Sequence, residues 1–144
     1  MIRRISALQP LPGIALATLA YVCGYAVRYG LVEPERFGAA CEKAGPWWCA
    51  PRTGFIVFTH WNGFGWAGLA IAALGVGLAL RAARRDGRLG GTTPAVHALA
   101  MAAMAVGGAG LVLYNSAFSA VAVVAALLLL CRRPAPGEAP HQAG

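Results

Sequence analysis

A chain of 144 residues with 58% hydrophobic and only 12% charged residues is too apolar for a soluble domain, in which about a quarter of the residues are charged. The net charge of +7 does not indicate a nucleic-acid partner, because the arginines gather just outside apolar runs rather than along one folded face. Composition therefore predicts an integral membrane protein whose first partner is the lipid bilayer, and no nucleic-acid partner is expected.

Four apolar runs follow one another, over about residues 8–32, 54–80, 94–114 and 116–131. Pro10 and Pro12 stand in the opening turn of the first run, where proline is tolerated. Thr93 is the predicted N-cap of a third helix that begins at Pro94. The fourth run is close to the lower limit of roughly 17 residues for a span. Because lipid cannot hydrogen-bond the backbone, the predicted fold is an all-α integral membrane protein, a four-transmembrane-helix bundle.

The bundle is expected to form one domain over residues 1–133, followed by a disordered cytoplasmic tail over residues 134–144 that is rich in Pro, Ala and Gly. Arginines gather at both ends of this domain and in the connection between its second and third helices. These are Arg3, Arg4, Arg81, Arg84, Arg85, Arg88, Arg132 and Arg133. The connections on the other side carry fewer basic residues, offset by acidic ones. The positive-inside rule therefore predicts cytoplasmic termini in the inner (cytoplasmic) membrane.

The loop over residues 33–53 is the main soluble segment, and it contains Cys41 and Cys49. On the predicted outer side these cysteines face an oxidising compartment, so we expect a disulfide that staples the loop. The four-helix topology with outer-loop cysteines resembles that of the quinone-linked disulfide oxidases and the vitamin K epoxide reductases. The resemblance is of topology alone, since neither family's Cys-x-x-Cys occurs in this chain. The wider spacing favours a structural staple over a redox-active pair.

A second group of residues is predicted to converge at the outer ends of the helices. It contains Tyr25, Arg28, His60, Asn62, Tyr114 and Asn115. The simpler interpretation is an aromatic belt with solvated helix ends, because Tyr, Trp and Arg gather at that depth in any membrane protein. The functional interpretation is a site for a quinone head group or a bound phospholipid. No other cofactor and no metal site is predicted.

The second and third helices also carry pairs of small residues four positions apart. These pairs are Gly68 with Ala72, Gly75 with Ala79, and Ala103 with Gly107. Such pairs let helix backbones approach closely. Because they exceed what four helices need for their own packing, they predict a docking face for another membrane protein.

The spans carry no acidic residue, and the chain has no Walker loop or catalytic triad. The preferred interpretation is a non-catalytic accessory subunit, or interaction protein, of a larger inner-membrane complex. One alternative is a quinone- or lipid-binding redox protein that uses the outer cluster. Another is a small homo-oligomeric channel or an immunity-type membrane protein.

Overall fold

The computed structural model describes residues 10–42, 45–86 and 93–132, and within these ranges it is helical apart from short turns. The helices are α1 (Leu11–Val27), the π-helix η1 (Arg28–Val32), α2 (Glu35–Glu42), α3 (Cys49–His60), α4 (Gly63–Asp86), α5 (Pro94–Val112) and α6 (Ser116–Leu130). The predicted disordered tail lies outside the described residues. The all-helical prediction is confirmed for the part of the chain that the structure describes.

Local chemistry accounts for where the helices begin. The Thr93 side chain accepts a hydrogen bond from the Val96 backbone N–H at 3.4 Å, and Pro94 occupies the first turn of α5, so the predicted N-cap is confirmed. Proline also stands in the first turn of α1. Neither proline costs a helical hydrogen bond, because the first amides of a helix have no partner within it.

Three helical segments are long and apolar enough to cross a membrane, and they identify the chain as a membrane protein. They are Leu11–Val32, Gly63–Arg85 and Pro94–Val112. Their lengths of 22, 23 and 19 residues meet the roughly 17 to 25 residues that a bilayer requires. The fourth apolar helix, α6, is shorter, with 15 residues.

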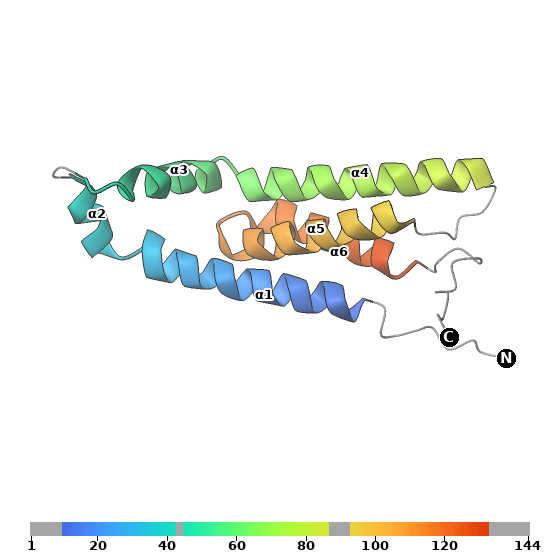
Figure 1. Ribbon diagram of the computed structural model, residues 1–144, viewed down its shortest axis with the longest axis horizontal. Coiled ribbons are helices and arrows are strands. Elements are labelled where there is room, and N and C mark those ends of the chain that lie inside the picture. The colour runs from blue at the N-terminus through green and yellow to red at the C-terminus, as the bar shows by residue number, and fades with distance from the viewer. Residues whose placement is uncertain (1–9, 43–44, 87–92, 133–144) are drawn as a thin grey trace, which may run out of the picture.

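Helix α5 is the centre of the bundle, and it packs against α1, α4 and α6, while α4 and α6 also pack against each other (Figure 1). The core consists mainly of small side chains, with Ala100, Ala103 and Ala122 fully buried around Met104. Small residues let apolar helices pack closely where lipid surrounds them, so the packing style suits a membrane bundle.

The prediction of one continuous second helix over residues 54–80 is wrong, because the structure has two helices there. The chain leaves α3 at His60 and begins α4 at Gly63, because Asn62 adopts a left-handed conformation with a φ of 56°. Asparagine tolerates that region better than most residues. The break is further fixed by the ring of Phe58, which occupies the space where a side chain at residue 63 would lie.

The predicted outer loop is also largely helical, because α2 and the first turn of α3 fall within residues 33–53. The Cys41–Cys49 disulfide is present and joins these two helices. The rings of Phe37 and Trp48 meet edge to face, with centroids 5.4 Å apart. Together η1, α2 and α3 form what we call the distal lobe, which lies beyond the end of the α5–α6 hairpin (Figure 1).

Candidate functional site

The strongest polar cluster lies where α1 meets the distal lobe, at the π-helical turn η1. The backbone N–H of Glu33 donates to the carbonyl of Arg28 at 2.9 Å, a hydrogen bond between residues five apart that defines a π turn. Pro34 follows and cannot donate a backbone hydrogen bond, so the helix ends here. Such π turns often occur at functional positions.

Arg28 connects this turn to the end of α5. Its Nε donates to Glu33 Oε1 at 2.8 Å, and its Nη1 donates to the Val112 carbonyl at 2.8 Å. Its guanidinium also lies over the Tyr114 ring, 3.9 Å from the centroid. Val112 ends α5, so Arg28 satisfies a carbonyl that has no partner within its own helix.

Glu33 and Tyr114 complete the cluster. The Tyr114 hydroxyl donates to Glu33 Oε1 at 2.8 Å, on the same oxygen that Arg28 contacts. The hydrogen bonds from Arg28 and then from Tyr114 hold the pKa of the Glu33 carboxyl below its usual value. The hydrogen bond to Glu33, with partial burial, raises the pKa of the Tyr114 hydroxyl. We call Arg28, Glu33 and Tyr114 the clamp, since they join α1 to the α5–α6 turn.

A second arginine caps α1 and η1 in the same manner. Arg52 of α3 donates from Nε to the Leu31 carbonyl at 3.0 Å and from Nη2 to the Val32 carbonyl at 2.7 Å. These carbonyls are among the last of the helix, where a positive side chain also interacts favourably with the helix dipole. Arg52 therefore fixes α3 to the end of α1, and the disulfide fixes α3 to α2.

Of the six predicted ligand-binding residues, Arg28 and Tyr114 come together in the clamp. Tyr25 lies beside it, with its ring 4.4 Å from that of Tyr29. His60 is exposed in the last turn of α3, and Asn62 forms the turn between α3 and α4. Neither joins the clamp through a side-chain hydrogen bond among the described residues.

Asn115, the sixth of these residues, is buried. Its Nδ2 donates to the Thr59 carbonyl at 3.3 Å and to the Leu113 carbonyl, so it ties the end of α3 to the α5–α6 turn. Asn115 Oδ1 and the hydroxyl of buried Ser119 have no partner within the described residues.

The predicted docking face lies inside the bundle. Ala72, Ala79 and Ala103 are at most 2% exposed, and Gly68, Gly75 and Gly107 are buried as well. A side chain at residue 68 would meet Ala122, and one at residue 107 would meet Val123. All six residues therefore serve contacts between helices of this chain, and the expected docking surface is corrected to an internal one.

The sequence pattern did not identify Glu33 or Arg52 as members of the cluster, although both were visible as charges in the outer connection. The side chains of Arg28, Glu33 and Tyr114 hydrogen-bond to one another, and Arg28 also donates to the Val112 carbonyl, so the clamp joins α1 to the α5–α6 turn. Residues 10–42, 45–86 and 93–132 contain no group of three or more His, Cys, Asp or Glu that could hold a metal ion. Comparison of the chain with family models, with curated proteins and with solved structures finds no match.

Proposed function

We propose that this chain crosses the inner membrane four times, with α6 as the fourth span. The helical stretch from Gly63 to Leu80 is about 27 Å long at 1.5 Å per residue. This length is close to the roughly 30 Å thickness of a bilayer's hydrocarbon core. Arg81 follows at one end of that stretch, and Asn62 precedes it at the other. Helix α6 is shorter, and Arg132 just beyond it can reach the head groups by snorkelling.

The basic residues orient the protein with both termini in the cytoplasm. Arg81, Arg84 and Arg85 lie in the last turns of α4, and the C-terminal end of α6 lies at the same end of the bundle (Figure 1). The positive-inside rule assigns that end to the cytoplasm. The distal lobe then faces the oxidising side, which suits its disulfide.

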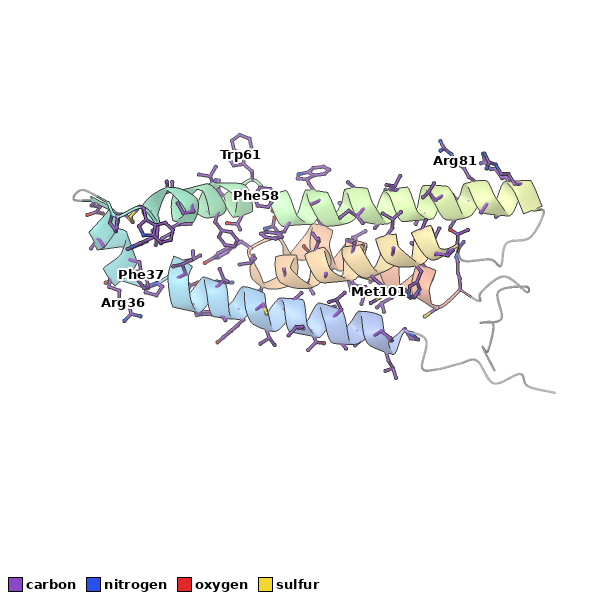
Figure 2. The ribbon with its side chains drawn as sticks, in the orientation of Figure 1. Arg36, Phe37, Phe58, Trp61, Arg81 and Met101 are labelled. Carbon is purple, nitrogen blue, oxygen red and sulfur yellow. A yellow bond between two sulfur atoms is a disulfide. The ribbon has the colours of Figure 1, made fainter. Side chains whose placement is uncertain are left out.

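Within this membrane placement, the chain acts as a non-catalytic accessory subunit that binds another membrane protein through α3 and its flanking turns, one side of the distal lobe. One observation carries this proposal: α3 and its flanking turns present large apolar side chains to the surroundings beyond the span of α4. The exposed fractions are 50% for Val57, 47% for Phe58, 75% for Trp61 and 85% for Trp47. Trp61 points away from α5 and α6 (Figure 2).

We take α4 alone as the second span, since it is long enough to cross the bilayer, and this places α3 and its apolar surface outside the hydrocarbon. Apolar surface of this kind, outside lipid, is typical of protein contacts. The partner that would bind this surface is an integral membrane protein with an apolar segment on the extracytoplasmic side. The clamp, Arg52 and the disulfide hold α3 in position, which reduces the ordering cost of binding.

A quinone or phospholipid at the clamp is the weaker proposal. The Arg28 guanidinium already contacts Glu33, Val112 and Tyr114, and the Tyr114 hydroxyl is bound to Glu33. A ligand would have to displace these contacts before it could bind. The geometry therefore favours a fastening over an open site.

Val57→Asp tests the accessory role, because it places a charge on the exposed face of α3. We expect the variant to lose comigration with its partner on native gels of mildly solubilised membranes, with unchanged abundance and melting temperature. Ala39→Asp is the matched control, since it adds the same charge to an exposed position of α2. Equal comigration of wild type and both variants would contradict this docking surface.

Orientation is tested separately by thiol labelling in intact cells. In a Cys23→Ala/Cys131→Ala background, which removes the two free cysteines, Glu35→Cys should react with an impermeant reagent and Arg84→Cys should not. Labelling at residue 84 from outside would contradict the proposed orientation.

A further inference from the structure

A groove between α4 and α6 remains after the bundle has packed. It has a volume of about 410 Å³ and is open along one side. Leu69, Ala73, Gly77 and Leu80 of α4 form one wall, and Val121 and Ala125 of α6 form the other. Its volume falls within the range of about 300 to 1,000 Å³ that is usual for bound small molecules, and its lining is almost wholly apolar.

The two walls run in the same direction from the clamp end to the basic end of the bundle. A side chain at residue 65 would meet Phe118, and one at residue 75 would meet Leu129, so positions along α4 and α6 advance together. Each wall leads to an arginine. Arg84 follows Leu80 by four residues, which returns α4 to the same face, and Arg132 lies just beyond the end of α6. Each helix that forms a wall of the groove therefore has an arginine toward the basic end of the bundle.

We propose that this groove binds one acyl chain of an anionic phospholipid, whose phosphate is held by Arg84 and Arg132. A guanidinium can form two parallel hydrogen bonds to a phosphate. Among the residues whose side chains the structure describes, neither arginine has an ion-pair or side-chain hydrogen-bond partner. Arg84 is exposed and Arg132 is half-buried. Basic pockets between spanning helices suit anionic head groups.

Charge complementarity favours a lipid over a partner helix in this groove. A helix that crosses the membrane beside α4 would bring its own Lys and Arg residues to the cytoplasmic end, where Arg84 and Arg132 would repel them. A phosphate at that depth neutralises both arginines. This inference rests on the proposed membrane placement and is independent of the docking surface on α3.

Native mass spectrometry of the full chain in mild detergent, titrated with phosphatidylglycerol or phosphatidylcholine, tests the proposal. We expect tighter binding of phosphatidylglycerol, and Arg84→Gln/Arg132→Gln should weaken it roughly 10- to 30-fold. The matched control is Arg85→Gln, which removes a charge from the same end of α4 but follows no groove-lining residue by four or seven positions. The affinity of this control variant for phosphatidylglycerol should change by less than about twofold.

The acyl-chain contact is tested by Gly77→Leu, which places bulk in the groove. Residue 77 has open space around it, so the variant is expected to fold and to lose most of its bound phosphatidylglycerol. Ala120→Leu adds the same bulk at an exposed position of α6 outside the groove, and binding should be retained.

Equal affinity for the two lipids, or an equal loss of affinity in Arg84→Gln/Arg132→Gln and in Arg85→Gln, would overturn the proposed head-group site. Unchanged binding by Gly77→Leu would overturn the acyl-chain site. Carbonate extraction of the same membranes distinguishes these failures from that of the membrane placement. A chain released by carbonate contradicts the placement itself, whereas a retained chain without lipid preference contradicts the groove alone.

Discussion

Arg28 and Glu33 form an ion pair at 2.8 Å although they are five residues apart, a separation that puts side chains on different faces of an α-helix. The pair forms because residues 28–32 wind as a π-helix, in which the backbone hydrogen bonds also join residues five apart. The Glu33 oxygen then accepts a second hydrogen bond from Tyr114, which brings the α5–α6 turn against the end of α1. The local winding of one turn thus fastens two distant segments.

Glu33→Gln should weaken this fastening, because a neutral amide cannot replace the ion pair with Arg28. We expect the melting temperature in detergent to fall by roughly 2 to 5 °C. Glu42→Gln, an exposed position at the end of α2, should leave it unchanged. The double variant Arg28→Gln/Glu33→Gln should lose less than the sum of the two single losses, since the ion pair is already absent in Arg28→Gln. Additive decreases would contradict the pairing.

The clamp also predicts how stability depends on pH. The pKa of Glu33 lies below its ordinary value of 4.5, so its contribution is present above that pH and is lost as the pH falls through the lowered pKa. The pKa of Tyr114 lies above its ordinary value of 10.0, so its contribution is lost as the pH rises through the raised pKa. The melting difference between wild type and Glu33→Gln should be constant from about pH 5 to 9 and should vanish in acid. Persistence of the full difference near pH 2 would contradict this assignment.

The sequence predicted the apolar helices, the Thr93 cap and the disulfide because each depends on local chemistry or on a long uniform pattern. The break at Asn62 was missed because the apolar residues on both sides merge it into one hydropathic run. The signal was the Asn-Gly dipeptide at residues 62 and 63, which is typical of a turn.

The composition of the clamp was only partly predictable. The sequence placed Tyr25 and Arg28 in one outer cluster but could not pair Arg28 with Glu33, since that pair requires a π turn. Small residues were recognised correctly as contact residues, but the pattern does not state whether a contact is internal. Ala103 is fully buried, so its contacts are with helices of this same chain. Which helix a small face meets depends on how the whole bundle packs.

Replacing both cysteines of the Cys41–Cys49 disulfide with serine should loosen the distal lobe. The pair closes a short loop, with a sequence separation of 8, and its loss should reduce the free energy of unfolding by about 2 to 3 kcal/mol. In hydrogen-exchange mass spectrometry, the amides of α2 and α3 should exchange faster while those of α5 stay protected. If the amides of α5 also exchange faster, to the same extent as those of α2 and α3, the disulfide does not act as a local staple.

Gly108→Ala should separate α1 from α5. A methyl group there would meet the carbonyl oxygen of Ala17 and would lie 2.9 Å from its Cα, and this backbone cannot move without shifting the whole helix. We expect a loss of about 1 to 3 kcal/mol in stability, measured by denaturant or thermal melting. Gly77→Ala is the control, since nothing lies within 4 Å of the added methyl group. Equal stability of the two variants would contradict the close α1–α5 packing.

Site-specific photocrosslinking in native membranes determines whether α3 binds another membrane protein outside the bilayer. Crosslinkers placed at Val57, Phe58 and Trp61 should each yield an adduct of one mass with the same integral membrane protein, and the control at Ala39 should yield none. If Val57→Asp prevents the adduct that a crosslinker at residue 61 forms, residues 57 and 61 belong to one docking surface. Adducts containing two copies of this chain would support the homo-oligomeric alternative. That result, or the absence of protein adducts at all three positions, would contradict the accessory role.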